Sequence, residues 1–61
     1  MEPPTVREVT KRLRKEGWKL EGCRGDHWKY SKAGSVVIVP GKMSDRLKPG
    51  TWASIRRRAG W

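Results

Sequence analysis

The sequence predicts an α+β fold in the order αβββα, in which two helices pack on one face of a three-stranded antiparallel sheet. Apolar residues recur at helical spacing near both ends of the chain, and the segment between them contains runs with a period of two. The chain of 61 residues fits a single domain, residues 1–61, and is too short to place a third layer over the sheet. We therefore expect one face of the sheet to remain exposed.

The first helix is predicted from a start signal, an apolar stripe and a stop signal. Residues 5–8 have the form of a capping box, in which Thr5 and Glu8 satisfy each other's backbone N–H groups. Glu8 is also placed to support Arg12 four residues later. Gly17 is suited to a left-handed C-cap. The apolar stripe consists of Val6, Val9 and Leu13.

The first two strands are predicted from the change to a period of two after Gly17. Strand one runs from about Trp18 to Cys23, and residues 24–25 form a tight reversal. In the next run, His27, Lys29 and Ser31 share one face, and Asp26, Trp28 and Tyr30 share the other. His27 and Lys29 should therefore lie on the polar face. Trp28 fits the packed face, whereas Tyr30 suits either the core or base stacking.

The second half of the chain contains a β-branched strand and a second helix. Residues 32–35 read as a turn before a strand at residues 36–39, which Pro40 and Gly41 stop. Residues 42–48 lack periodicity and read as a loop, and a helix follows that Gly60 caps and Trp61 packs against. The predicted core is Val6, Val9, Leu13, Leu20, Val37, Val39, Ile55 and Ala59, with Trp18 and Trp52 at its edges.

The charge of the chain points to a polyanionic partner. Fifteen Lys and Arg residues against six Asp and Glu give a net charge of +9, with a sequence pI near 10.7. Such a surface attracts nucleic acid. No stretch approaches the roughly 18 apolar residues of a membrane span, and no secretory signal opens the chain. We therefore expect a soluble, cytoplasmic protein.

Metal and cofactor chemistry has little support in the sequence. Cys23 and His27 each occur once, which is too few for a zinc site with the usual four ligands, and the carboxylates are scattered along the chain. We therefore expect no metal and no cofactor. His27, on an exposed basic sheet face, is the candidate catalytic residue, because imidazole can move protons near neutral pH. The candidate RNA-binding residues are Arg24, Lys29, Tyr30, Lys11, Lys15, Lys42 and Lys48.

The order and spacing of several segments resemble the HicA toxins of bacterial and archaeal toxin–antitoxin modules. These segments are residues 16–20 (Glu-Gly-Trp-Lys-Leu), Gly25-Asp26-His27 with Tyr30 three residues later, residues 36–40, and residues 47–55 followed by Ala59-Gly60. The resemblance runs from about Thr5 to Trp61. One departure is that the family usually has Gly-Ser-His, whereas this chain has Asp26 before His27.

The resemblance implies a double-stranded-RNA-binding-domain-like fold and an endoribonuclease, or mRNA interferase, that cleaves mRNA without the ribosome. It also implies neutralisation by a HicB antitoxin, and it places the catalytic histidine at His27. Two other interpretations remain open from the residues alone. One is a noncatalytic RNA-binding module of the same fold. The other is a small DNA-binding architectural protein, which is disfavoured because neither predicted helix resembles a polar recognition helix.

Overall fold

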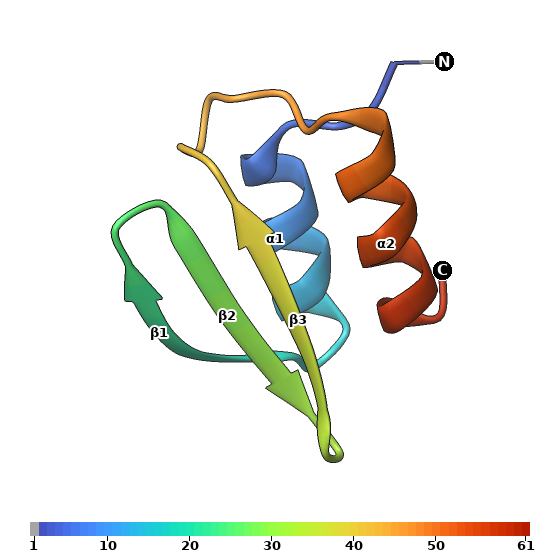
Figure 1. Ribbon diagram of the computed structural model, residues 1–61. Coiled ribbons are helices and arrows are strands. Elements are labelled where there is room, and N and C mark those ends of the chain that lie inside the picture. The colour runs from blue at the N-terminus through green and yellow to red at the C-terminus, as the bar shows by residue number, and fades with distance from the viewer. Residues whose placement is uncertain (1) are drawn as a thin grey trace.

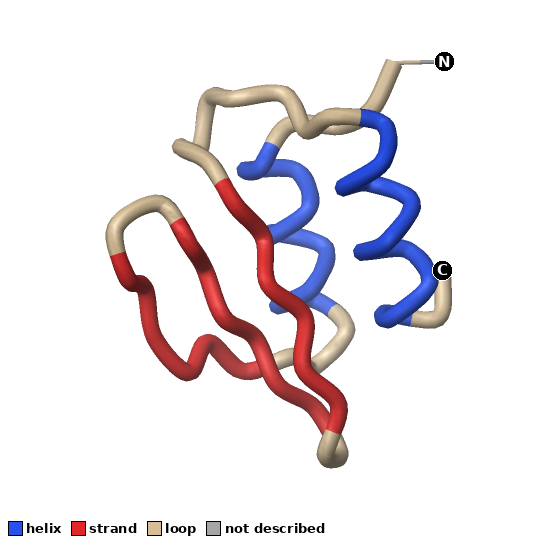
Figure 2. Tube along the Cα trace, in the orientation of Figure 1, coloured by secondary structure: helices blue, strands red, loops and turns tan. Residues whose placement is uncertain are grey.

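The computed structural model describes residues 2–61 and has the predicted αβββα order (Figure 1). The sheet is antiparallel with strand order β1-β2-β3, so β2 is central. Both helices cover one face of the sheet, and the other face is open (Figures 1 and 2). The elements are α1 (Val6–Lys15), β1 (Lys19–Arg24), β2 (His27–Lys32), β3 (Ser35–Pro40) and α2 (Pro49–Ala59).

Helix α1 begins and ends as predicted. Thr5 Oγ1 accepts a hydrogen bond from Glu8 N at 3.3 Å, and Thr5 N donates to Glu8 Oε1 at 3.4 Å, which completes the capping box. Gly17 follows the helix with a φ of +93°, and Trp18 N donates to Leu13 O at 2.9 Å. We expected Glu8 to pair with Arg12. Instead, Glu8 completes the capping box, and Arg12 forms an ion pair with Glu16.

The β2–β3 hairpin is closed by a two-residue turn. Ala33 and Gly34 both have positive φ values, 49° and 85°, as a type I′ turn requires. The backbone twist of this turn matches the twist of paired strands, so it sets the β2–β3 register without a bulge. The predicted turn at residues 32–35 is confirmed.

The core lies between the sheet and the helices, and it corrects the prediction at Leu20 and decides the position of Tyr30. Leu20 is 40% exposed, because β1 is an edge strand that the helices do not cover; all six of its residues are exposed. Tyr30 instead fills the centre of the core and has no exposed surface. Strand β1 starts at Lys19, one residue later than predicted, and Trp18, just before it, is buried. The buried apolar residues are Val6, Val9, Leu13, Trp18, Tyr30, Val37, Val39, Leu47 and Ile55.

The segment between β3 and α2 is the loop that the sequence predicts, and it is tied to the start of α1. Val6 N donates to Asp45 O at 2.8 Å, and Arg7 N donates to Met43 O at 3.0 Å. These bonds satisfy two N–H groups that the first turn of a helix leaves without partners. Leu47 is buried at the end of this segment and adds to the core.

Trp61 joins the C-terminal ends of the two helices. Its backbone N donates to Arg56 O at 2.9 Å, which folds it back over the end of α2 as predicted. Its indole Nε1 donates to Glu16 Oε1 at 2.7 Å, and the Arg12 guanidinium lies 4.0 Å from the ring centroid. The Trp52 ring packs beside it with a centroid separation of 5.9 Å.

The Glu16–Trp61 contact predicts a pH-dependent stability. The hydrogen bond from Trp61, followed by that from Arg12, lowers the pKa of the Glu16 carboxyl below its ordinary value of 4.5. A lowered pKa in the folded state means a stabilising contribution that is present above pH 4.5 and is lost as the pH falls through the folded-state pKa. Wild type should therefore have a higher Tm than Glu16→Gln at about pH 7, and the difference should shrink as the pH falls below 4.5.

The control for this comparison is Asp26→Asn, which removes an exposed carboxylate in the turn between β1 and β2. A difference between wild type and Glu16→Gln that stays constant across the pH range would contradict a role for the ionised carboxylate.

The buried hydroxyl of Tyr30 gives a second stability prediction. Among residues 2–61, the structure provides no hydrogen-bond partner for this hydroxyl. A buried polar group without a partner costs about 1–3 kcal/mol, so Tyr30→Phe should raise the free energy of unfolding by about 1 kcal/mol in urea titrations. Tyr30→Ala, which empties the core, should lower it by about 3–5 kcal/mol. A loss of stability in the Phe variant would show that the hydroxyl is satisfied.

Candidate active site

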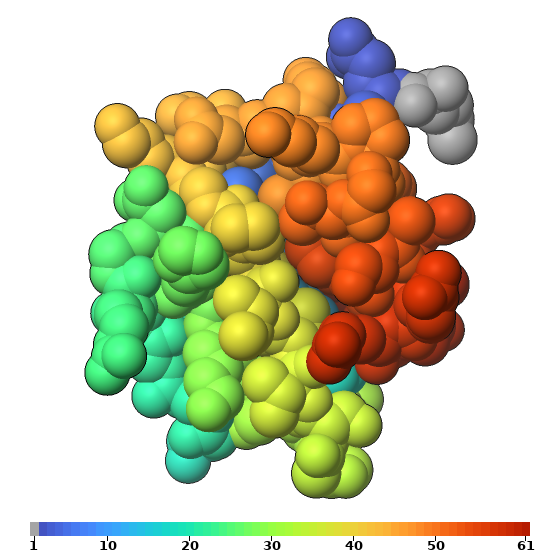
Figure 3. Space-filling model, viewed as in Figure 1, coloured from blue at the N-terminus to red at the C-terminus, as the bar shows by residue number. Residues whose placement is uncertain are grey.

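The candidate site lies on the open face of the sheet, where β1 and β2 meet. Antiparallel pairing sets Arg24 directly opposite His27 and Gly22 opposite Lys29. Directly opposite residues project from the same face, so these side chains gather on the side that the helices leave free. His27, Lys29 and Arg24 are all exposed. In Figure 3 the green and yellow atoms of β2 and β3 face the viewer without a covering helix.

A β-bulge places Arg24 beside His27. The register changes between Leu20, which pairs with Tyr30, and Gly22, which pairs with Lys29, so Glu21 is an extra residue in β1. Strict alternation from Leu20 would put Arg24 on the same side of the sheet as Leu20 and Tyr30, which is the side of the helices. The extra residue reverses the alternation and brings the Arg24 guanidinium to the face that carries the imidazole.

The end of β3 fixes the position of His27 from the other side. Pro40 is its cross-strand partner, and just beyond it Gly41 N donates to Asp26 O at 2.7 Å. Trp28 is half-buried below the open face, and its Nε1 donates to Gly41 O at 2.9 Å. Hydrogen bonds on both sides of His27 in the chain therefore hold the β1–β2 turn against the end of β3.

The backbone at this junction favours glycine at position 41. Its φ is +109°, which residues with a side chain rarely adopt, and a Cβ atom there would lie 3.3 Å from Val6 Cγ2 and 3.4 Å from Asp45 Oδ2. A side chain would therefore add backbone strain and tight contacts with α1 and the following loop. The stop after β3 that the sequence predicts thus has a second role, which is to anchor the turn next to His27.

The side chains around His27 form a shallow depression that contains both positively and negatively charged groups. Its cations are Arg24 and Lys29, and Glu21 contributes a carboxylate. The hydroxyl of Ser31 donates a hydrogen bond to Glu21 Oε2, which holds that carboxylate on the same face. The full lining is Glu21, Gly22, Cys23, Arg24, His27, Lys29 and Ile38. The arrangement offers a proton-transfer group beside two cations that can bind a phosphate.

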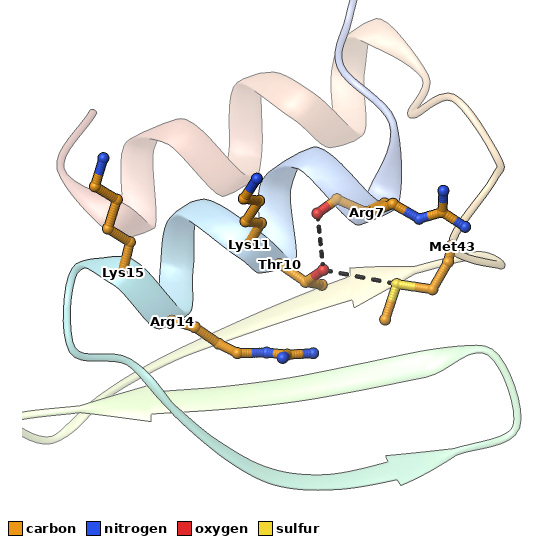
Figure 4. Close-up of a pocket in the computed structure, with 6 residues that line it drawn as sticks. All are labelled: Arg7, Thr10, Lys11, Arg14, Lys15 and Met43. Carbon is orange, nitrogen blue, oxygen red and sulfur yellow. Dashed lines mark hydrogen bonds between the residues drawn. The ribbon is translucent and has the colours of Figure 1, made fainter.

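The structure brings only some of the predicted RNA-binding residues to this face. Lys42 is exposed two residues after Pro40, so it follows the strand end next to His27. Lys11 and Lys15 lie on α1, in the other layer of the fold (Figure 4). Lys48 is the N-cap of α2 and is not among the residues that line the depression.

Tyr30 does not share the surface of His27. Its position in β2 points it at the helices, and its ring is fully buried. Base stacking needs an exposed ring, so the structure corrects the assignment of Tyr30 as an RNA contact and gives it to the core.

Four of the seven lining residues were absent from the predicted site, and two of these four have large side chains. Glu21 is one, and the interior glycine that follows it, Gly22, is the signal that could have indicated a bulge. Ile38 is the other: it lies opposite Lys29 and is 50% exposed. Its outward direction follows from the burial of its neighbours, Val37 and Val39.

Across residues 2–61, no group of three or more His, Cys, Asp and Glu side chains is arranged to hold a metal ion. Within the same residues, no helix is long and apolar enough to cross a membrane.

Comparison with known proteins gives one match. The family model described as the HicA toxin of bacterial toxin–antitoxin matches residues 6–61, which is nearly the whole chain. No curated protein and no solved structure matches the chain significantly.

Proposed function

Since the chain belongs to the HicA toxin family of bacterial toxin–antitoxin systems, we propose that it is an endoribonuclease that cleaves mRNA and is neutralised by a HicB-type antitoxin. The observation that carries the proposal is the exposed imidazole of His27 in one depression with two cations, Arg24 and Lys29. Phosphate binding and proton transfer are the two requirements for cleaving RNA without a metal, and this face offers groups for both.

In the proposed reaction the ribose 2′-oxygen loses its proton and attacks the adjacent phosphorus. The bond from phosphorus to the 5′-oxygen breaks, and that oxygen takes up a proton, leaving a 2′,3′-cyclic phosphate and a 5′-hydroxyl. His27 serves as the general acid that protonates the leaving oxygen. The positive charges of Arg24 and Lys29 stabilise the extra negative charge that the phosphate develops in the transition state.

The second proton transfer needs a group on the same face. Tyr30 is buried and cannot reach the RNA, and Arg24 and Lys29 are suited to binding phosphate. Glu21 places a carboxylate at the rim of the depression, where it can accept a proton. We therefore assign Glu21 as the base that takes the 2′-OH proton, with Ser31 as the residue that positions it. A pair of unlike groups, one acid and one base, would replace the two-histidine arrangement that a chain with one histidine cannot form.

Replacing the imidazole tests the catalytic assignment. His27→Ala should lower the rate of cleavage of single-stranded RNA by about 10²–10⁴-fold in the presence of a chelator, because one positioned acid or base contributes that much. Binding of the same RNA, measured by fluorescence anisotropy, should change little, since Arg24 and Lys29 remain.

Two outcomes would redirect the proposal. Equal cleavage by wild type and His27→Ala would remove His27 from the mechanism. RNA binding by wild type without any cleavage would favour the noncatalytic RNA-binding module.

The pH–rate profile tests the pairing of Glu21 with His27. With a carboxylate base and an imidazolium acid, the rate should first rise and then fall as the pH is increased. Glu21→Gln should slow cleavage and remove the rising limb on the acidic side, while the falling limb remains. Ser31→Ala, the matched control, keeps the carboxylate and should keep both limbs. An unchanged profile in Glu21→Gln would exclude it as the base.

A further inference from the structure

A second shallow depression lies on the helical layer, and Figure 4 shows the side chains that line it. We call it the α1 groove. Five of its residues come from α1, and Met43 comes from the loop that is tied to the start of that helix. In Figure 4, Lys11 and Lys15 point away from the sheet, and Arg14 extends along the sheet side of the helix. The lining is Arg7, Thr10, Lys11, Arg14, Lys15 and Met43.

The rim of the α1 groove is positively charged and unneutralised. The ion pairs within residues 2–61 are Arg12 with Glu16 and Arg46 with Glu2, so none of the four cations of the groove is paired with a carboxylate. Arg7, Lys11 and Lys15 follow each other at intervals of four residues, which corresponds to a rise of about 6 Å per step along the helix. An occupant should therefore carry negative charges at a similar spacing. Phosphates of an extended RNA strand and carboxylates one helical turn apart both meet this condition.

The floor of the groove distinguishes between these two occupants. Thr10 is only 2% exposed, and its hydroxyl lies 3.1 Å from Arg7 O and 3.6 Å from Met43 Sδ, so its polar group is satisfied inside the protein. The wall of the groove is mainly apolar, and no aromatic ring or amide side chain lines it. Bases are recognised by stacking and by edge hydrogen bonds, which this lining does not offer. Thioether and arginine side chains beside an apolar floor are typical of protein interfaces.

The groove is also separate from the candidate active site. Five of its six residues lie on α1 and Met43 lies in the adjoining loop, whereas His27 lies on the open face of the sheet. The two surfaces share no residue. Substitutions in the groove therefore leave the residues that line the depression around His27 unchanged.

We infer that the α1 groove is a docking site for the antitoxin of the same module. The occupant is an amphipathic segment whose apolar side chains cover Met43 and Thr10 and whose carboxylates pair with the cations of the rim. The inference rests on the antitoxin partner in the proposed function, but it does not depend on RNA cleavage. It adds an anchoring surface that lies apart from the residues proposed to act on RNA.

The test compares two double variants with equal charge. Arg7→Glu/Arg14→Glu reverses two charges in the groove, and Arg57→Glu/Arg58→Glu reverses two exposed charges at the end of α2. Each reversal changes the charge by two, so both variants go from +9 to +5. The probes are the purified antitoxin and a fluorescent single-stranded RNA. We expect the groove variant to weaken the antitoxin Kd by about 30-fold and the control by less than about 3-fold. The rate of RNA cleavage should be similar in the two variants.

Three other results would overturn the inference. Equal weakening of antitoxin binding in both variants would indicate a general charge effect. Weaker RNA binding in the groove variant alone, with unchanged antitoxin affinity, would make the groove an RNA surface. Unchanged antitoxin affinity in both variants would exclude the groove from the interface. A wild-type protein that binds the antitoxin but cleaves no RNA would refute the proposed function and leave this measurement interpretable.

A second variant tests the apolar floor. Met43→Gln removes the apolar end of the side chain without changing the charge, and it should weaken antitoxin binding by about 5–10-fold while RNA binding is unchanged. Thermal unfolding of each variant establishes that it is folded under the assay conditions. Antitoxin affinity that is unaffected in folded Met43→Gln would contradict an amphipathic occupant.

Discussion

The candidate site depends on one constraint: one face of β2 packs against the helices, and the other face is open to solvent. Tyr30 and Trp28 point at the helices, where Tyr30 is fully buried and Trp28 is half-buried and hydrogen-bonded to Gly41. Successive residues of a strand face opposite sides, so burial of these rings directs His27 and Lys29 to the open face. Burial of the two rings in the core thus keeps the imidazole of His27 on the exposed face. With 61 residues there is no third layer to cover it.

Two irregular backbone features, a bulge in β1 and a glycine with positive φ after β3, complete the site around His27. The bulge at Glu21 interrupts β1, and it is this extra residue that turns Arg24 toward His27. At the other end, the positive φ of Gly41 lets β3 close against α1 while its backbone binds both Asp26 and Trp28. The proposed phosphate-binding and proton-transfer groups therefore come from two adjacent strands, β1 and β2, and hydrogen bonds to Gly41 at the end of β3 hold the turn between them.

The two layers of the fold divide the positive charge between two surfaces. The sheet surface combines cations with an imidazole and a carboxylate, which suits chemistry on a phosphodiester. The α1 groove combines cations with an apolar floor, which suits a protein partner. The loop at residues 42–48 links the layers, because Met43 forms part of the groove and the segment begins next to the strand end that holds His27. A toxin of this size can in this way present separate faces to a substrate and to an inhibitor.

The sequence by itself determined the element order, the capping box at Thr5, the turn at residues 32–35, the end of the third strand at Pro40–Gly41, and the alternation that exposes His27 and Lys29. These features follow from local preferences and from periodicity, which need no distant partner. Only the tertiary structure decided that Leu20 is exposed, that Tyr30 is core, and that Arg24 and Glu21 join His27. Burial of an edge strand depends on how far the helices reach, and a bulge depends on how two strands pair, so neither can be read from one segment alone.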